Sequence, residues 1–301
     1  MNYEEFLIQL MAKDDRYLAV TAENRAPMRN LPARFPDRFL DVGIAEQTMI
    51  GMAAGLALRG RIPIVHALAS FLTMRSFEFI RTDIGLGNLP VKLVGALAGF
   101  LSEANGPTHQ ALEDIALMRG IPRMNVFCPA DEADMLAGLP RVLSSSAPFY
   151  IRYNDLKPQT EHVPYEIGKA EVFGDGRDVA ILCYGFLFHQ ALAAKEALAG
   201  KGLGVRLVNL RTLKPIDEEA LVAAARDCKL VVTVEDHFLS GGLYTMLAEV
   251  LLRHRITARV LPFALEEKWF KPAPLHDALE YEGFTGGRMA ERIGRGLEAG
   301  E

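Results

Sequence analysis

Short runs of apolar, β-branched residues alternate along this chain with segments of helical spacing. In the first half the strand-like runs lie at residues 17–23, 38–43, 62–68, 91–98, 124–128 and 148–153. The segments between them predict helices at residues 45–59, 71–85, 108–120 and 131–139. Strands that are apolar on both faces and are followed by helices are typical of a parallel sheet covered on both sides. The pattern therefore predicts an α/β fold with a mostly parallel, doubly wound sheet.

This alternation breaks near residue 160 and then resumes. Residues 154–178 are rich in proline, glycine and charge without a clear period, which predicts a linker that runs into an edge hairpin. Beyond it, apolar runs at 179–185, 205–210, 230–236 and 258–265 again alternate with helical segments. We therefore expect two domains, residues 1–160 and residues 161–301, the second a smaller α/β domain.

Composition narrows the class of protein. The 301 residues are half hydrophobic and about a quarter charged, which is enough for two cores. A net charge of -5 argues against nucleic-acid binding. No apolar run reaches the roughly 18–20 residues that span a bilayer, and the acidic N-terminus does not resemble a signal peptide. Three distant cysteines fit no metal spacing and suit a reducing cytosol, so we expect a cytoplasmic protein.

Three stretches of the first domain follow predicted strands, where open parallel sheets bind ligands. They are residues 43–47, 70–77 and 105–110. Glu46 lies in the first turn of its helix, where the helix dipole favours an acid, and this is the simpler explanation. The helix that follows has little solvent-facing character, however, and a buried carboxyl tends to stay protonated and to donate a hydrogen bond. A functional Glu46 would then need a base or a ring nitrogen as its partner.

The aromatic and histidine residues of the other two stretches allow two explanations each. Phe71 and Phe77 have helical spacing, which is more typical of a core than of a cofactor stack. His109 follows Thr108, which can cap a helix, so the ring would lie near the positive end of the dipole with a lowered pKa. A surface histidine at a helix start is the alternative.

Two glycine motifs of the second half suggest ligand sites that we do not favour. FGDGRD, residues 173–178, is similar to the Gly-Asp-Gly that opens a diphosphate–magnesium motif, but it precedes a strand and has the composition of a hairpin turn. TVEDHFLSGGL, residues 233–243, could bind an anion at a helix start, but we favour packing or a subunit contact. We predict no metal ligand in this chain.

Taken together and in order, the motifs of the chain resemble the C-terminal half of a transketolase. They are DVGIAEQ, SFLTMRSFEFIR, GPTHQALEDIALMR, VFCPADEADM and FYIRY, followed in the second domain by EIGKAEV, NLRTLKPID and VEDHFLSGGL. The second-domain motifs also resemble the β subunit of 2-oxoacid dehydrogenases and deoxyxylulose-phosphate synthase. The stretch EDIALMRGIPRMNVFCPAD favours transketolase, and SEANGPTHQ has one histidine where 2-oxoacid dehydrogenases usually have two.

The resemblance implies thiamine diphosphate as cofactor and a role for each candidate residue. Glu46 occupies the position of the glutamate that hydrogen-bonds N1′ of the aminopyrimidine, so that the 4′-nitrogen can remove the C2 proton. Phe71 stacks on the pyrimidine, and Met74 and Phe77 occupy neighbouring pocket positions. His109 hydrogen-bonds the sugar and its intermediates. The reaction implied is transfer of a two-carbon ketol unit from a ketose donor to an aldehyde acceptor.

The resemblance also implies a second polypeptide. A complete transketolase holds the diphosphate and Mg²⁺ in an N-terminal domain, for which this sequence offers no credible substitute. We therefore expect the β subunit of a split transketolase whose partner, of similar size, carries the diphosphate and Mg²⁺ motif, in an α2β2 heterotetramer. The alternatives are the β subunit of a 2-oxoacid dehydrogenase E1 component and a non-catalytic scaffold that has lost the cofactor.

Three positions depart from the family pattern. Asn105 replaces an aspartate that reads a donor hydroxyl, Leu97 replaces a histidine that helps to bind sugar phosphate, and Met28 replaces a phosphate-binding serine. Arg152, in YIRYN, is retained as a predicted substrate contact. Each lost hydrogen bond to the sugar phosphate removes about 1–3 kcal/mol of binding free energy. The sequence therefore predicts an altered donor or acceptor, less phosphorylated or more apolar than the usual sugar phosphates.

Overall fold

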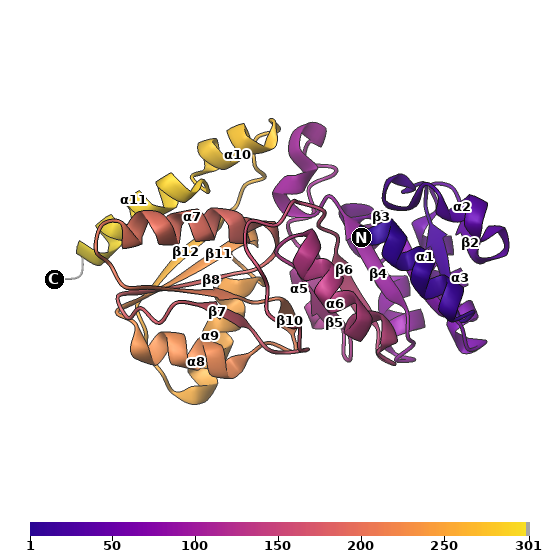
Figure 1. Cartoon of the computed structure of the whole chain (residues 1–301), viewed down its shortest axis with the longest axis horizontal. Helices are drawn as coiled ribbons and strands as arrows, with labels where there is room; N and C mark the ends of the chain where they lie inside the picture. The colour runs from indigo at the N-terminus through magenta and orange to yellow at the C-terminus, as the bar shows by residue number, and fades with distance from the viewer. Residues whose placement is uncertain (299–301) are drawn as a thin grey trace.

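Two β-sheets covered by helices lie side by side in the computed structural model, which describes residues 1–298 (Figure 1). The indigo-to-magenta first part of the chain forms one layered unit and the orange-to-yellow second part forms the other. The predicted α/β fold class, with a larger first and a smaller second sheet, is confirmed.

The first sheet has seven strands in the order β10-β5-β6-β4-β3-β1-β2. Their bounds are β1 (Tyr17–Thr21), β2 (Phe39–Asp41), β3 (Ile62–Leu68), β4 (Lys92–Ala96), β5 (Asn125–Phe127), β6 (Phe149–Arg152) and β10 (Thr212–Lys214). Every pair is parallel except β10 with β5. The mostly parallel sheet predicted from the apolar runs is thus confirmed, with strands somewhat shorter than those runs.

Helices cover both faces of this sheet. They are α1 (Tyr3–Lys13), α2 (Leu31–Arg34), α3 (Glu46–Leu58), α4 (Phe77–Phe79), α5 (Asp114–Gly120) and α6 (Glu132–Ser144). Side chains of α1 and α6 share one core cluster, whereas those of α3 and α5 share another. The buried positions Met49, Ile50, Ala53 and Ala57 lie along one side of α3, whereas Met52 and Leu58 are exposed, so the helix has more solvent-facing surface than its apolar sequence predicts.

Two of the predicted helices differ from the structure. The segment predicted as one helix over residues 71–85 consists of a π-helical turn (Phe71–Arg75), the short α4 and a second π-helical segment (Ile80–Gly85). The helix predicted from residue 108 begins only at Asp114, because Gly106, Pro107 and the residues after them form a turn. Helical periodicity does not distinguish α- from π-hydrogen bonding, nor does it fix where bonding starts.

The second sheet has the strand order β12-β11-β8-β9-β7. Its strands are β7 (Glu171–Phe173), β8 (Val179–Cys183), β9 (Val205–Asn209), β11 (Leu230–Phe238) and β12 (Val260–Leu265). Helices α8 (Glu218–Asp227) and α9 (Leu243–His254) cover one face, and α7 (Phe188–Ala199), α10 (Leu275–Glu282) and α11 (Gly286–Glu298) lie on the other side (Figure 1).

The predicted hairpin at residues 173–178 is wrong, although β7 does lie at the edge of the sheet. Strand β7 pairs antiparallel with β9, and β9 separates it from β8. The glycines of this segment serve packing, because a Cβ at Gly176 would lie 2.1 Å from the backbone of Gly204 and Val205.

The two units are joined by backbone and by a shared core. Strand β10 comes from the second half of the chain but adds to the first sheet, where the Cys128 N–H donates to the Arg211 carbonyl at 2.8 Å. One core cluster runs from α3 and α5 into α8 and α9. The domain division at residue 160 therefore stays a prediction. No helix among the described residues is long and apolar enough to cross a bilayer.

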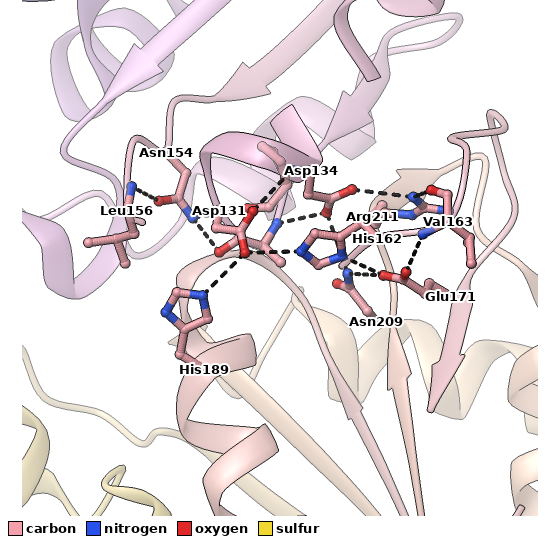
Figure 2. A network of polar contacts seen from close by, with 12 residues as sticks. Asp131, Asp134, Asn154, Leu156, His162, Val163, Glu171, His189, Asn209 and Arg211 are labelled. Carbon is pink, nitrogen blue, oxygen red and sulfur yellow. Dashed lines mark hydrogen bonds and ion pairs between the residues drawn. The ribbon is translucent and has the colours of Figure 1, made fainter. Parts of the chain in front are cut away.

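A buried polar network also connects the two units (Figure 2). The ring of His162, in the connecting segment, lies 3.0 Å from Asp131 Oδ2 and 2.8 Å from Glu171 Oε2. Asp131 precedes α6 of the first unit, and Glu171 begins β7 of the second. Asp131 also contacts His189 of α7 at 3.3 Å, and Asn209 of β9 donates to Glu171 at 3.2 Å.

These contacts determine the charge of His162. Burial lowers the pKa of its ring, but the hydrogen bonds to Asp131 and Glu171 outweigh burial and raise it to about 10. Burial likewise raises the pKa of the Glu171 carboxyl, and His162 with its other donors outweighs this and holds it below its ordinary value. At neutral pH the network is therefore an imidazolium between two carboxylates.

The first prediction concerns His162 and pH. Its folded pKa of about 10 exceeds the unfolded value near 6.5. Its contribution to stability is therefore complete below about pH 6.5 and is lost as the pH rises towards 10. Chemical denaturation of the wild type and His162→Gln should show a difference in unfolding free energy that shrinks over this interval. Titrating groups that do not interact with His162 cancel in that difference, so a difference that stays constant from pH 6.5 to 10 would contradict the assignment.

Candidate functional site

Glu46 is the first residue of α3, which begins after the short loop that follows β2. The residue is only 2% exposed, although α3 carries no side-chain cap at its N-terminus. Both carboxylate oxygens accept hydrogen bonds from Nη1 of Arg75, at 2.9 and 3.1 Å. In this conformation the carboxyl therefore accepts from a guanidinium, which only donates, instead of donating the hydrogen bond expected from the sequence.

Arg75 connects Glu46 to Phe71. Arg75 and Phe71 belong to the π-helical turn after β3, where they stand four residues apart. The guanidinium carbon of Arg75 lies 4.2 Å from the centroid of the Phe71 ring, a cation–π contact. Arg75 was not among the residues predicted from sequence, since a single arginine on an expected helix carries no distinguishing signal.

His109 contacts the same aromatic ring. Its imidazole meets Phe71 edge to face, with centroids 5.0 Å apart and planes at 65°. The residue is half-buried in the turn at Gly106, whose carbonyl accepts from the His109 N–H at 2.9 Å. Because α5 begins only at Asp114, the predicted position of His109 at a helix start is wrong.

The structure thus brings the three predicted stretches together through Glu46, Arg75, Phe71 and His109. Of the other predicted residues, Met74 is exposed on the π-helical turn, and Phe77 is half-buried against the core. Core packing therefore explains the position of Phe77.

Asn105 is exposed, and its side-chain amide donates to the Ser102 carbonyl at 2.8 Å.

The predicted substrate contact of Arg152 is wrong. The side chain is buried at the end of β6 and pairs with Asp114 at 2.7 and 2.8 Å and with Asp236 at 2.5 Å. Three of its five N–H groups donate to these carboxylates, and the side chain is only 5% exposed, so little of the guanidinium is open to a ligand. Met28 is also buried, in the core beneath α1, so that position does not line a substrate site either.

Arg152 is the cation paired with the two carboxyl groups of this cluster, and the pKa values of the two shift in opposite directions. Burial raises the pKa of Asp114, but Arg152 and the Tyr150 hydroxyl outweigh it and hold the carboxyl below its ordinary value. For Asp236 burial dominates, and its pKa rises to about 6 despite the contact with Arg152. Asp114 and Asp236 were missed from sequence. The available signals were the acid Asp236 within an otherwise apolar strand and the acid Asp114 in the first turn of a helix.

Packing explains the VEDHFLSGGL motif, as favoured from sequence. The Glu235 carboxylate accepts from the backbone N–H groups of Leu243 and Tyr244 at 2.5 and 2.9 Å, so the N-terminus of α9 is already satisfied within the chain. A Cβ at Gly242 would lie 1.9 Å from Glu235 Oε2, which accounts for the glycine.

The second half of the chain also fixes the loop that carries Asn105 and His109. Gly99, at the start of this loop, has φ of +57°, and a Cβ there would lie 1.7 Å from Asp236 Oδ2. Further along, the Gln110 side chain donates to the Phe270 carbonyl at 2.9 Å. The buried cluster of Arg152 is therefore directly connected to the loop of the candidate site.

Comparison with known proteins identifies both halves of the chain. Residues 2–158 match the family described as "Transketolase, pyrimidine binding domain", and residues 168–289 match "Transketolase, C-terminal domain". A solved structure described as "Split gene transketolase, inactive beta4 tetramer" superposes with a TM-score of 0.87 at 33% identity, covering 98% of this chain and 96% of that one.

Two curated relatives show the range of activities in the group. The 6-deoxy-6-sulfo-D-fructose transketolase subunit SqwH of Clostridium sp. (strain MSTE9) is 38% identical over 83% of this chain and 79% of its own length. A 1-deoxy-D-xylulose-5-phosphate synthase of Synechococcus sp. (strain JA-2-3B'a(2-13)) is 36% identical over 95% of this chain. The chain spans only 45% of that synthase.

The second prediction tests the structural role of Arg152. Arg152→Ala should lower the free energy of unfolding by about 3–5 kcal/mol, because it leaves two buried carboxylates without their cation. Chemical denaturation measures this, with Arg81→Ala as a control that removes an exposed arginine and should change stability by less than about 0.5 kcal/mol. A loss as small as that of the control would contradict the structural role.

Proposed function

The chain belongs to the transketolase family, and we propose that it is the pyrimidine-binding subunit of a two-subunit, thiamine-diphosphate-dependent transketolase. The proposed reaction transfers a two-carbon ketol unit from a ketose donor to an aldehyde acceptor. The observation that carries the proposal is the contact chain from Glu46 through Arg75 and Phe71 to His109, which unites three stretches distant in sequence.

The residues present fit the aminopyrimidine of this cofactor. Glu46 and Phe71 already hold a flat, nitrogen-bearing group, the Arg75 guanidinium, which donates hydrogen bonds to the carboxylate and has its central carbon 4.2 Å from the centroid of the ring. An aminopyrimidine offers the same flat shape and edge nitrogens. When bound, thiamine diphosphate supplies the carbanion chemistry at C2. In this proposal Glu46 holds a proton at N1′, Phe71 orients the ring by stacking, and Met74 and Phe77 supply apolar surface.

His109 is assigned to the sugar. Its Nδ1 contacts the Thr108 hydroxyl at 2.9 Å, so we assign Nε2 to the substrate hydroxyls. The contact with Phe71 places the imidazole beside the ring on which we expect the cofactor to stack. Asn105, exposed at the end of the same loop, is the second proposed substrate contact. Both lie on a loop that the second half of the chain holds in place.

We further propose that activity requires a partner subunit. The relative SqwH is described as a subunit, and the similar split-gene structure is described as an inactive β4 tetramer. By this likeness the partner carries the diphosphate and most of the Mg²⁺ coordination, and the complex is a cytoplasmic α2β2 heterotetramer. Apolar side chains exposed around α3 supply surface for assembly, with Leu58 74% and Leu86 80% exposed.

The donor sugar is proposed to differ from the usual sugar phosphates. Leu97 stands where the family has a phosphate-contacting histidine, and Arg152 is engaged by two carboxylates. SqwH, by its description, acts on a sulfonated fructose, which has no phosphate at C6. A ketose without the ordinary terminal phosphate is therefore our proposed donor class, with 6-deoxy-6-sulfofructose as the first compound to test.

The third prediction concerns this reaction. The complex of the chain with its partner, thiamine diphosphate and Mg²⁺ should transfer a ketol unit. Its kcat/KM for xylulose 5-phosphate should be about tenfold or more below that for its best donor. One missing charge-assisted hydrogen bond, about 1.5–3 kcal/mol, accounts for such a ratio. Steady-state kinetics on a panel of phosphorylated, sulfonated and unsubstituted ketoses measures it.

Two outcomes would contradict these proposals separately. If xylulose 5-phosphate is as good as any other donor, the altered donor is wrong while ketol transfer stands. If the complex releases carbon dioxide from a 2-oxoacid and transfers no ketol unit, the chain instead belongs with 2-oxoacid dehydrogenase E1 components or deoxyxylulose-phosphate synthases.

A further inference from the structure

Arg75 makes both contacts that the proposed function assigns to the cofactor's pyrimidine. Its Nη1 donates to both oxygens of Glu46, and its guanidinium carbon lies 4.2 Å above the ring of Phe71. A flat group stacked on this ring and hydrogen-bonded to this carboxylate uses the same two surfaces that the aminopyrimidine needs. The two groups therefore cannot occupy the site together.

We propose that Arg75 is an internal competitor that covers Glu46 and Phe71 and has to leave them before thiamine diphosphate binds. The proposal rests on the proposed function, since it concerns the same pyrimidine site. The proposed function gives Arg75 no role of its own, and this proposal adds one. Cofactor binding then displaces a side chain instead of filling an empty pocket.

The burial of the two partners differs in a way that suits displacement. The side chain of Glu46 is 3% exposed, so its carboxylate needs a cation or a hydrogen-bonding ring beside it. The side chain of Arg75 is 42% exposed, so its guanidinium is already partly hydrated and can rotate fully into water. The arginine is thus the mobile partner of the pair and the glutamate the fixed one.

The backbone around Arg75 is held independently of its side chain. The Arg75 carbonyl accepts from the Gln47 side-chain amide at 3.4 Å, and the next residue, Ser76, is buried. Thr73, two residues earlier, is also buried and donates to the Ala69 carbonyl at 2.7 Å. Departure of the guanidinium therefore requires side-chain rotation and leaves Phe71, on the same turn, in position to stack.

The expected consequence is a cofactor affinity reduced by the fraction of molecules in which Arg75 covers the site. A partly exposed ion pair and a cation–π contact each contribute modestly, so removal of the side chain should tighten binding by about 3- to 10-fold. Before the cofactor binds, the Arg75 guanidinium also supplies the positive charge that the buried Glu46 carboxylate needs beside it.

The test is calorimetric titration of thiamine diphosphate, with Mg²⁺, into the complex of the chain with its partner. Arg75→Ala should lower the Kd by about 3- to 10-fold. The matched control is Arg81→Ala, which removes an exposed arginine from the neighbouring helical segment, where it pairs with Glu78 at 3.0 Å. The control should leave the Kd unchanged, so a tighter Kd in Arg75→Ala does not reflect net charge alone.

Each outcome bears on one proposal. A Kd for Arg75→Ala equal to or weaker than the wild-type value, at unchanged thermal stability, overturns the competitor. If the wild-type complex binds no thiamine diphosphate, the proposed function fails and the competitor fails with it. If wild type and control bind alike and Arg75→Ala binds more tightly, the competitor is supported.

Discussion

Arg152 holds the two halves of the molecule together by pairing with one buried carboxylate from each. Asp114 begins α5 of the first unit, and Asp236 lies on β11 of the second. Such a triad is stable only while all its members are present, since a lone charge in this environment is strongly unfavourable. Gly99 packs directly on Asp236, so the geometry of this pairing reaches the loop that carries His109.

The candidate site depends on the same architecture. Parallel strands bring the loops that follow them to one edge of the sheet, and three of these loops supply Glu46, Phe71 and His109. The buried N-terminus of α3 fixes the carboxylate, while the π-helical turn after β3 presents the aromatic ring. One half of the proposed cofactor site is thereby built on rigid elements, and the proposed partner would supply the other half.

Much of the fold was predictable because its elements are local. Apolar runs predicted every parallel strand of both sheets, and the order of motifs indicated which loops would meet. The short antiparallel edge strands β7 and β10 do not stand out as apolar runs, and β10 pairs with a strand far away in the sequence. The partners of Arg152 were not predictable, because Asp114 and Asp236 lie 38 and 84 residues away and neither stands in a recognisable spacing. The contact of Arg75 with Glu46 was missed for a related reason, since the two residues are 29 apart and a single arginine on an expected helix carries no distinguishing signal.

The central claim is that Glu46 acts on the cofactor, and turnover of Glu46→Ala in the assembled complex tests it most directly. Loss of a positioned proton-transfer group lowers rates by about 10²–10⁴-fold, so kcat should fall by at least about 100-fold while the complex remains assembled. A variant that assembles and turns over at the wild-type rate would contradict the account.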